Sequence, residues 1–132
     1  MKGKMPTRVK SKNPVVILKA VIKAIQEEPK RYDQSIVYVR HNSGSDRQPD
    51  YFPSCGTVAC VAGWVNILTG VRNKYDVYRA GEKLGLEDTV EMNKLFGIGR
   101  VPWRKDMTPE AHAKAGVAHI RRFVKAKWGK NI

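Results

Sequence analysis

The longest mainly apolar run in the sequence spans residues 55–68, and it constrains the fold more than any other stretch. Its apolar residues cover most of the circumference of a helix, which is typical of a helix buried on every side. Thr57 can cap the start of this helix, and Gly70 lies where a left-handed residue can end it. The run is too short to cross a bilayer. We therefore predict a buried central helix over 57–69.

Helix start signals mark four further segments. In each, a capping side chain precedes a proline or an apolar stripe of helical spacing; the predicted caps are Asn13, Asp76, either Asp88 or Thr89, and Thr108. Residues 36–41 are instead rich in β-branched and aromatic side chains, which favour a strand. We predict a mainly α single compact domain of about five helices around the central helix, with one short strand or hairpin.

At 132 residues with 42% hydrophobic side chains, the chain is expected to form one domain with a real core. We divide it into a flexible basic arm, residues 1–12, and a helical domain, residues 13–132. No stretch has the pattern of a signal peptide or of a transmembrane helix, so a soluble protein without a membrane partner is expected. Two cysteines make no disulfide framework and favour a reducing, cytoplasmic location.

Lysine and arginine number 25 against 12 acidic residues, and the excess is confined to the two ends of the chain. Residues 1–26 hold seven cations and residues 111–132 hold six, and neither segment contains an acid. The stretch 27–110 is neutral overall. This asymmetry favours a polyanionic partner, because each cation placed on a phosphate can release a condensed counterion. Basic ends that only keep a small protein soluble are the simpler alternative.

The leading hypothesis is a non-enzymatic accessory protein that binds the backbone of nucleic acid. We find no helix that would place base-reading residues in a groove, so we expect weak sequence preference. Trp103 and Trp128 lie beside cations and could stack on bases, although large aromatic side chains more often cover a core. The predicted nucleic-acid-binding residues are Lys2, Lys4, Arg8, Lys10, Lys12, Lys19, Lys23, Lys114, Arg121, Arg122, Lys125 and Lys127.

The cysteines and histidines are the candidates for catalytic and metal chemistry. Cys55, with His41 as a base, could serve as a nucleophile, because a helix start favours a thiolate. Cys60 is expected to be a small core residue within the central helix. The histidines His112 and His119 lie two turns apart, too far to share a zinc ion, and are expected to be partly exposed. We predict no catalytic residue, no metal and no cofactor.

The run from Cys55 to Trp64 resembles a motif of small uncharacterised bacterial and phage proteins, Cys-Gly-Thr-x-x-Cys-x-Ala-Gly-Trp. In that group a short helix ending in Leu-Gly-Leu follows, here residues 84–86, and then a Leu-Phe pair, here residues 95–96. The resemblance spans residues 14–123. It implies a cytosolic setting in a prokaryotic cell or a phage-infected host, and it implies no particular activity.

Two other classes of function stay open. The resemblance and the long loop over 41–54 suit a small phage-type inhibitor or adaptor that docks on a host protein, with Tyr51 and Phe52 as its aromatic anchors. A thiol-dependent enzyme using Cys55 is the third possibility. Whether the first and last helices are neighbours decides between a single basic surface and a diffuse charge.

Overall fold

The computed structural model describes residues 8–32, 38–40, 57–72, 76–97, 101 and 106–132. The predicted mainly α fold is confirmed within this part of the chain, which contains five α-helices, one 3-10 turn and a pair of short strands. In chain order the elements are α1 (Pro14–Glu27), η1 (Pro29–Arg31), β1 (Tyr38–Arg40), β2 (Thr57–Ala59), α2 (Val61–Thr69), α3 (Val77–Lys83), α4 (Thr89–Phe96) and α5 (Pro109–Trp128).

Side chains cap four of these helices at the residues that the sequence predicts. Asn13 Oδ1 accepts a hydrogen bond from the Val15 amide at 2.9 Å, and Thr108 Oγ1 accepts one from the Ala111 amide at 3.1 Å. The carboxylates of Asp76 and Asp88 cap α3 and α4 in the same way. Each cap satisfies an amide that would otherwise lack a partner in the first turn, so the helix starts are fixed locally.

The central helix is confirmed, but its predicted start at Thr57 is wrong. All eight residues from Val61 to Leu68 are buried, and Gly70 ends the helix in the left-handed region with φ 77°. The helix begins at Val61, with Cys60 as its extended N-cap, so Cys60 lies just before the helix rather than inside it. Residues 57–59 form β2, which pairs antiparallel with β1 so that Val58 lies opposite Val39. The partner strand overrides the capping signal of Thr57, because a ladder stabilises extended backbone in β-branched residues.

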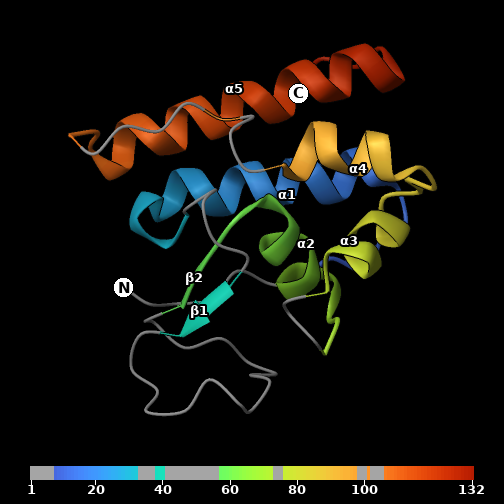
Figure 1. Ribbon diagram of the computed structural model, residues 1–132, viewed down its shortest axis with the longest axis horizontal. Coiled ribbons are helices and arrows are strands. Elements are labelled where there is room, and N and C mark those ends of the chain that lie inside the picture. Colours follow the sequence, from blue (N-terminus) through green and yellow to red (C-terminus); the bar gives the residue numbers. More distant parts are fainter. Residues whose placement is uncertain (1–7, 33–37, 41–56, 73–75, 98–100, 102–105) are drawn as a thin grey trace.

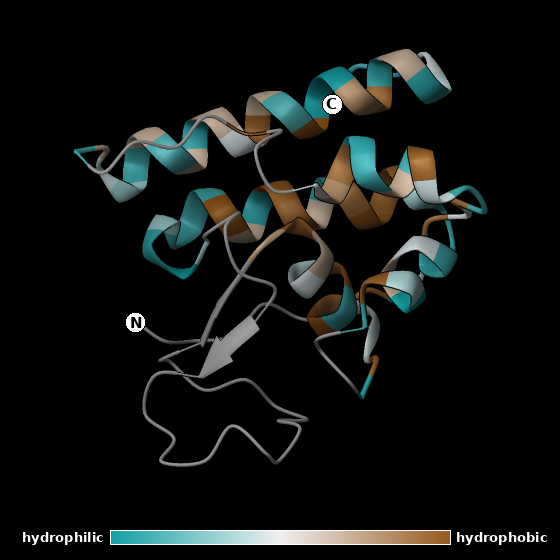
Figure 2. Ribbon diagram, in the orientation of Figure 1, coloured by the Kyte–Doolittle hydropathy of each residue, from teal (hydrophilic) through white to brown (hydrophobic). Residues whose placement is uncertain are grey.

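The helix α1 lies between α5 on one side and α2 on the other. In Figure 1, α5 crosses above α1 and runs in the opposite direction, while α2 lies on the other side of α1. The short helices α3 and α4 close one end of the molecule, and α4 also contacts α5. Apolar residues concentrate where α1, α2 and α4 meet, whereas apolar and polar residues alternate along α5 (Figure 2). The helix α1 is therefore the shared support of α2 and α5.

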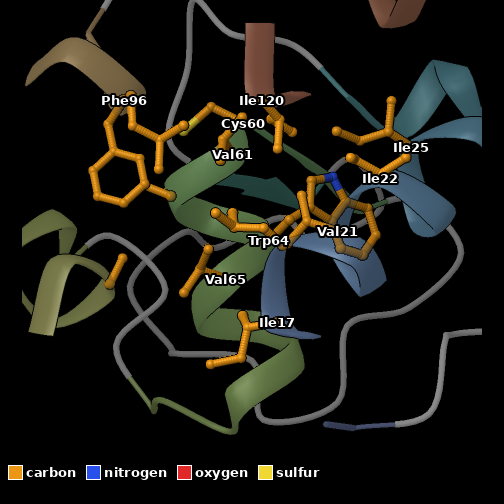
Figure 3. Packing of buried hydrophobic residues seen from close by; sticks show 14 of the residues in the cluster. Ile17, Val21, Ile22, Ile25, Cys60, Val61, Trp64, Val65, Phe96 and Ile120 are labelled. Atoms are coloured by element: carbon orange, nitrogen blue, oxygen red, sulfur yellow. The ribbon is translucent and has the colours of Figure 1, made fainter. Parts of the chain in front are cut away.

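Trp64 of α2 lies at the centre of the core, among side chains from α1 (Figure 3). It is 1% exposed, and its indole Nε1 donates a hydrogen bond of 2.9 Å to the carbonyl oxygen of Arg31. The buried guanidinium of Arg31 lies 6.0 Å from the centre of the Trp64 ring. These contacts fix η1 against α2, because burial of a large aromatic side chain and a satisfied indole N–H act together.

The described end of the basic arm contacts the core. The Val9 amide donates to the Leu68 carbonyl oxygen at 2.8 Å, and the half-buried Val9 side chain packs against the core. Residues 8–10 therefore run past the end of α2 before α1 begins. Among the described helices, none combines the length and the apolarity that a membrane-spanning segment needs.

Candidate nucleic-acid interface

A groove of about 390 Å³ lies between the end of α1 and the first half of α5. Small or apolar side chains line it together with charged and amide side chains. The described lining residues are Gln26, Pro29, Glu110, Ala113, Lys114, Val117, Ala118 and Arg121. Gln26 near the end of α1 and Pro29 of η1 line the groove together with Glu110 from the start of α5, which agrees with the antiparallel course of α1 and α5 in Figure 1.

Helical periodicity extends the α5 side of this groove. Lys114 and Arg121 both line the groove, and Lys125 follows Arg121 by one turn. All three side chains are exposed. With a rise of about 1.5 Å per residue, they form a row roughly 16 Å long on the exposed side of α5 that borders the groove. The sequence prediction that these three residues share one exposed face agrees with this placement.

Two lysines occupy the corresponding side of α1. Gln26 lines the groove, and the exposed Lys19 and Lys23 precede it by seven and three residues. Seven residues are nearly two full turns and three are nearly one, so both lysines lie on the side of α1 that Gln26 occupies. Because the helices are antiparallel, Lys19 and Lys23 lie alongside the later part of α5. Lys114 and Arg121 line the groove, and Lys19, Lys23 and Lys125 extend its two sides by helical periodicity; we call these five cations together the basic groove.

One carboxylate interrupts the basic groove at its end. Glu110 lies in the first turn of α5 and lines the groove, four residues before Lys114. An acid in a first turn stabilises the helix through the helix dipole. The same charge opposes a negatively charged ligand at that end, so the anion-attracting part of the groove extends from Lys114 towards Lys125.

Aromatic packing beneath α5 fixes the position of the groove. Tyr32, which follows η1, is 3% exposed and stacks on His112 of α5 with ring centres 5.0 Å apart. Gly116, one turn further along α5, faces the same Tyr32 ring so closely that a β-carbon there would meet ring carbons at 2.5 Å. The absence of a side chain at Gly116 thus lets η1 approach α5. The expectation that His112 is partly exposed is wrong, because its ring is 4% exposed and covered by Tyr32.

His119 is half-buried, as the sequence predicts. Its Nε2 lies 3.1 Å from the carbonyl oxygen of Leu95, which joins α5 to α4. No cluster of three or more metal-ligating side chains occurs within the described residues. Cys60 is buried, at 3% exposure, which keeps its side chain away from solvent.

The remaining predicted cations lie away from the groove or are engaged by other groups. Lys127 Nζ forms an ion pair of 2.6 Å with Glu91 of α4. Arg122 is exposed, but it is turned about 100° further round α5 than Arg121. The Arg8 side chain lies beside Gly70 at the end of α2, and Lys10 and Lys12 are exposed before α1. Of the twelve predicted residues, Lys114 and Arg121 line the groove, and helical periodicity puts Lys19, Lys23 and Lys125 on the same sides of α1 and α5.

Several predicted residues lie outside the described part of the chain. They are Lys2, Lys4, His41, Tyr51, Phe52, Cys55 and Trp103. The stacking surface, the aromatic anchors and the thiol nucleophile that were predicted on these residues stay predictions. Trp128 is described and half-buried: its ring packs edge-on against Phe123, with Lys127 Nζ 5.7 Å from its centre.

Sequence reasoning missed the neutral part of the site. Gln26, Pro29, Ala113, Val117 and Ala118 line the groove, and none was predicted as a site residue. Gln26, which is exposed, and Ala118, which is half-buried, carry no local signal in the sequence, because the groove exists only once α5 docks on α1. No protein-family model, curated protein or solved structure matches the chain.

Proposed function

We propose that this protein binds nucleic acid non-enzymatically, with the sugar–phosphate backbone lying along the basic groove between α1 and α5. The observation that carries the proposal is the groove between the two antiparallel helices, which Lys114 and Arg121 of α5 line. Helical periodicity supports it, because Lys19 and Lys23 share a side of α1 with the groove residue Gln26, and Lys125 shares a side of α5 with Arg121. Cations on both sides of one groove can contact a single chain of phosphates, and each contact releases counterions.

The groove residues also support weak sequence preference. Lysine and arginine on helix surfaces position a phosphate backbone, whereas sequence is read by side chains that reach base edges. Apart from these cations, the described lining consists of Glu110, Gln26 and apolar residues. The floor of alanine, valine and proline can accept sugar edges without a directional hydrogen bond. We therefore expect similar affinity for unrelated sequences of equal length.

The test compares two triple variants that lose the same charge. The groove variant carries Lys19→Gln, Lys114→Gln and Lys125→Gln, and it retains Arg121 because the Nε of that residue donates to the Ile132 carbonyl oxygen at 3.0 Å. The control variant carries Lys83→Gln, Lys94→Gln and Lys130→Gln, three exposed cations on α3, on α4 and after the end of α5. Fluorescence anisotropy with a labelled mixed-sequence DNA duplex gives the affinity at several salt concentrations.

With five phosphate contacts, the slope of log affinity against log salt should be about −4.5 for the wild type. The groove variant should lose about 2.7 of that slope, and the control variant should keep the wild-type slope. Equal losses in both variants would mean that binding depends on total charge and not on the groove. A wild-type protein that binds no duplex at low salt would remove the proposal altogether.

A second candidate is a protein partner with an acidic, amphipathic segment. The groove supports it through an apolar floor, formed by Ala113, Val117 and Ala118, beside the cations of Lys114 and Arg121. Such a partner would remain bound after nuclease treatment, whereas nucleic acid would be removed. Pull-down with and without nuclease, repeated with the groove variant, separates the two candidates.

A further inference from the structure

We infer that the residues after α5 fold back and position Arg121 for contact with a phosphate, an inference that rests on the proposed function. Arg121 lines the groove, and its Nε donates a hydrogen bond of 3.0 Å to the main-chain oxygen of Ile132. The two residues are 11 positions apart in the sequence, so this bond forms only when the chain returns along α5. We call residues 129–132 the return segment.

A left-handed glycine reverses the chain at the end of α5. Gly129 has φ 68°, and its amide donates to the Lys125 carbonyl oxygen at 3.0 Å. Arg121 precedes Gly129 by about 12 Å along the helix axis. The residues that follow Gly129 can span about 10 Å when extended, which brings Ile132 within reach of the long arginine side chain. Figure 1 shows the same course, since the C-terminal end is marked beside α5 and not beyond its last turn.

An apolar contact holds the return segment in place. The Ile132 side chain is half-buried and packs against the core. A single exposed hydrogen bond contributes little by itself, because water competes for both of its partners. Burial of apolar area at Ile132 adds the stabilisation that the bond lacks. The packing of Ile132 therefore fixes the acceptor, and the acceptor in turn fixes the guanidinium of Arg121.

The guanidinium of Arg121 can hold a phosphate while it keeps this bond. Nε carries one of its five N–H donors, and the two Nη nitrogens carry the other four. Two parallel N–H donors of an arginine match two oxygens of a phosphate. A side chain that is already held loses less rotamer freedom on binding than a mobile one. The return segment should thus raise the affinity of the groove without adding a contact of its own.

This positioning role has its own signature in the salt dependence. Removal of the Arg121 charge should reduce the slope of log affinity against log salt by about 0.9, because one phosphate contact is lost. Release of the return segment leaves that charge in place, so the slope should stay unchanged. The affinity should instead fall about two- to tenfold at every salt concentration, which is the cost of ordering one long side chain.

The main test variant is Gly129→Val, because a β-branched residue is strained at positive φ. No described atom lies within 4 Å of the place that a β-carbon would take at Gly129, so the strain acts on the turn and not on packing. Gly129→Asn keeps the turn, since asparagine adopts this region more readily than other side chains. Gly85→Val is the matched control: Gly85 follows α3 with φ 72°, again with no described atom within 4 Å.

Fluorescence anisotropy with a mixed-sequence DNA duplex gives the affinity at several salt concentrations, and urea unfolding shows that each variant is folded. We expect Gly129→Val to bind about two- to tenfold more weakly with the wild-type slope. Gly129→Asn and Gly85→Val should bind like the wild type. Ile132→Ser, which removes the apolar anchor, should reproduce the loss. In an Arg121→Gln background, Gly129→Val should cause no further loss, because the side chain that it positions is gone.

The outcomes separate this inference from the proposed function. If Gly129→Val binds as tightly as the wild type, or more tightly, the inference is overturned and nucleic-acid binding stands. An equal loss in Gly85→Val, or a loss that persists in the Arg121→Gln background, would overturn it as well, because the effect would then not pass through Arg121. A wild-type protein that binds no duplex would reject the proposed function itself.

Discussion

Replacement of Gly116 by alanine tests whether close packing of Tyr32 against α5 sets the position of the groove. A β-carbon at this position would meet Cε2 and Cζ of the Tyr32 ring at 2.5 Å, about 1 Å closer than an ordinary contact. The ring cannot turn aside freely, since it is 3% exposed and stacked on His112. Gly116→Ala should therefore push η1 and α5 apart.

The magnitude follows from two opposing effects. Alanine in place of glycine inside a helix stabilises the fold by about 1 kcal/mol, whereas overpacking of a tight core costs about 1–3 kcal/mol. Because the displaced group is a locked ring, we expect the upper part of that range and a net loss of about 2 kcal/mol in the free energy of unfolding.

Gly81→Ala provides the matched control. A β-carbon at Gly81 of α3 would meet Met92 Sδ at 2.7 Å and Cε at 2.6 Å, which is as close as the contact at Gly116. The thioether chain can adopt another rotamer at a cost of about 0.5–1.5 kcal/mol, which the helix propensity of alanine offsets. Its stability should stay within about 0.5 kcal/mol of the wild type.

Urea unfolding followed by tryptophan fluorescence measures both variants, because Trp64 is buried in the core and becomes exposed on unfolding. Tyr32→Leu in the Gly116→Ala background should recover part of the loss, as expected for two residues in contact. If Gly116→Ala proves as stable as Gly81→Ala, the tight approach of Tyr32 to α5 does not constrain the fold and the reasoning is refuted.

Glu110→Gln should raise the affinity for a DNA duplex about two- to fivefold at low salt, because a carboxylate within the groove repels phosphate. Glu87→Gln, which removes an exposed acid outside the groove, should leave the affinity unchanged in the same anisotropy titration. Lys125→Gln should reduce the slope of log affinity against log salt by about 0.9. Lys127→Gln should leave this slope unchanged, because Lys127 is already paired with the carboxylate of Glu91. Identical slopes for the two variants would contradict the assignment of Lys125 to the basic groove. Thr108→Ala should lower the free energy of unfolding by about 1 kcal/mol in urea titration without altering the salt slope, since only the cap of α5 is lost.

Local signals in the sequence predict much of the fold. Caps such as Asn13 and Thr108 act within three residues of their own position, so the helix starts follow from the sequence alone. The start of α2 could not be obtained in this way, because residues 57–59 are held by β1 from another part of the chain. Periodicity located the buried stripe of α1 for the same local reason.

The candidate site was predictable only in its separate halves. Charge patterning identified Lys19 and Lys114, but the packing of α1 on α5 that makes them neighbours is a long-range contact. The same limit explains why the covering of His112 by Tyr32 and the ion pair of Lys127 with Glu91 were not predicted. Tyr32 and Glu91 are far in sequence from His112 and Lys127, so no local sequence pattern predicts either contact.

The antiparallel pairing of α1 with α5 has a consequence for how a ligand would affect the fold. The stretch 29–108 separates the two helices along the chain, so the site is absent until the last helix has docked. A polyanion that touches both helices would then act as a clamp between the ends of the polypeptide. Its binding would raise the free energy of unfolding in proportion to the logarithm of its concentration, and undocking of α5 alone would release it.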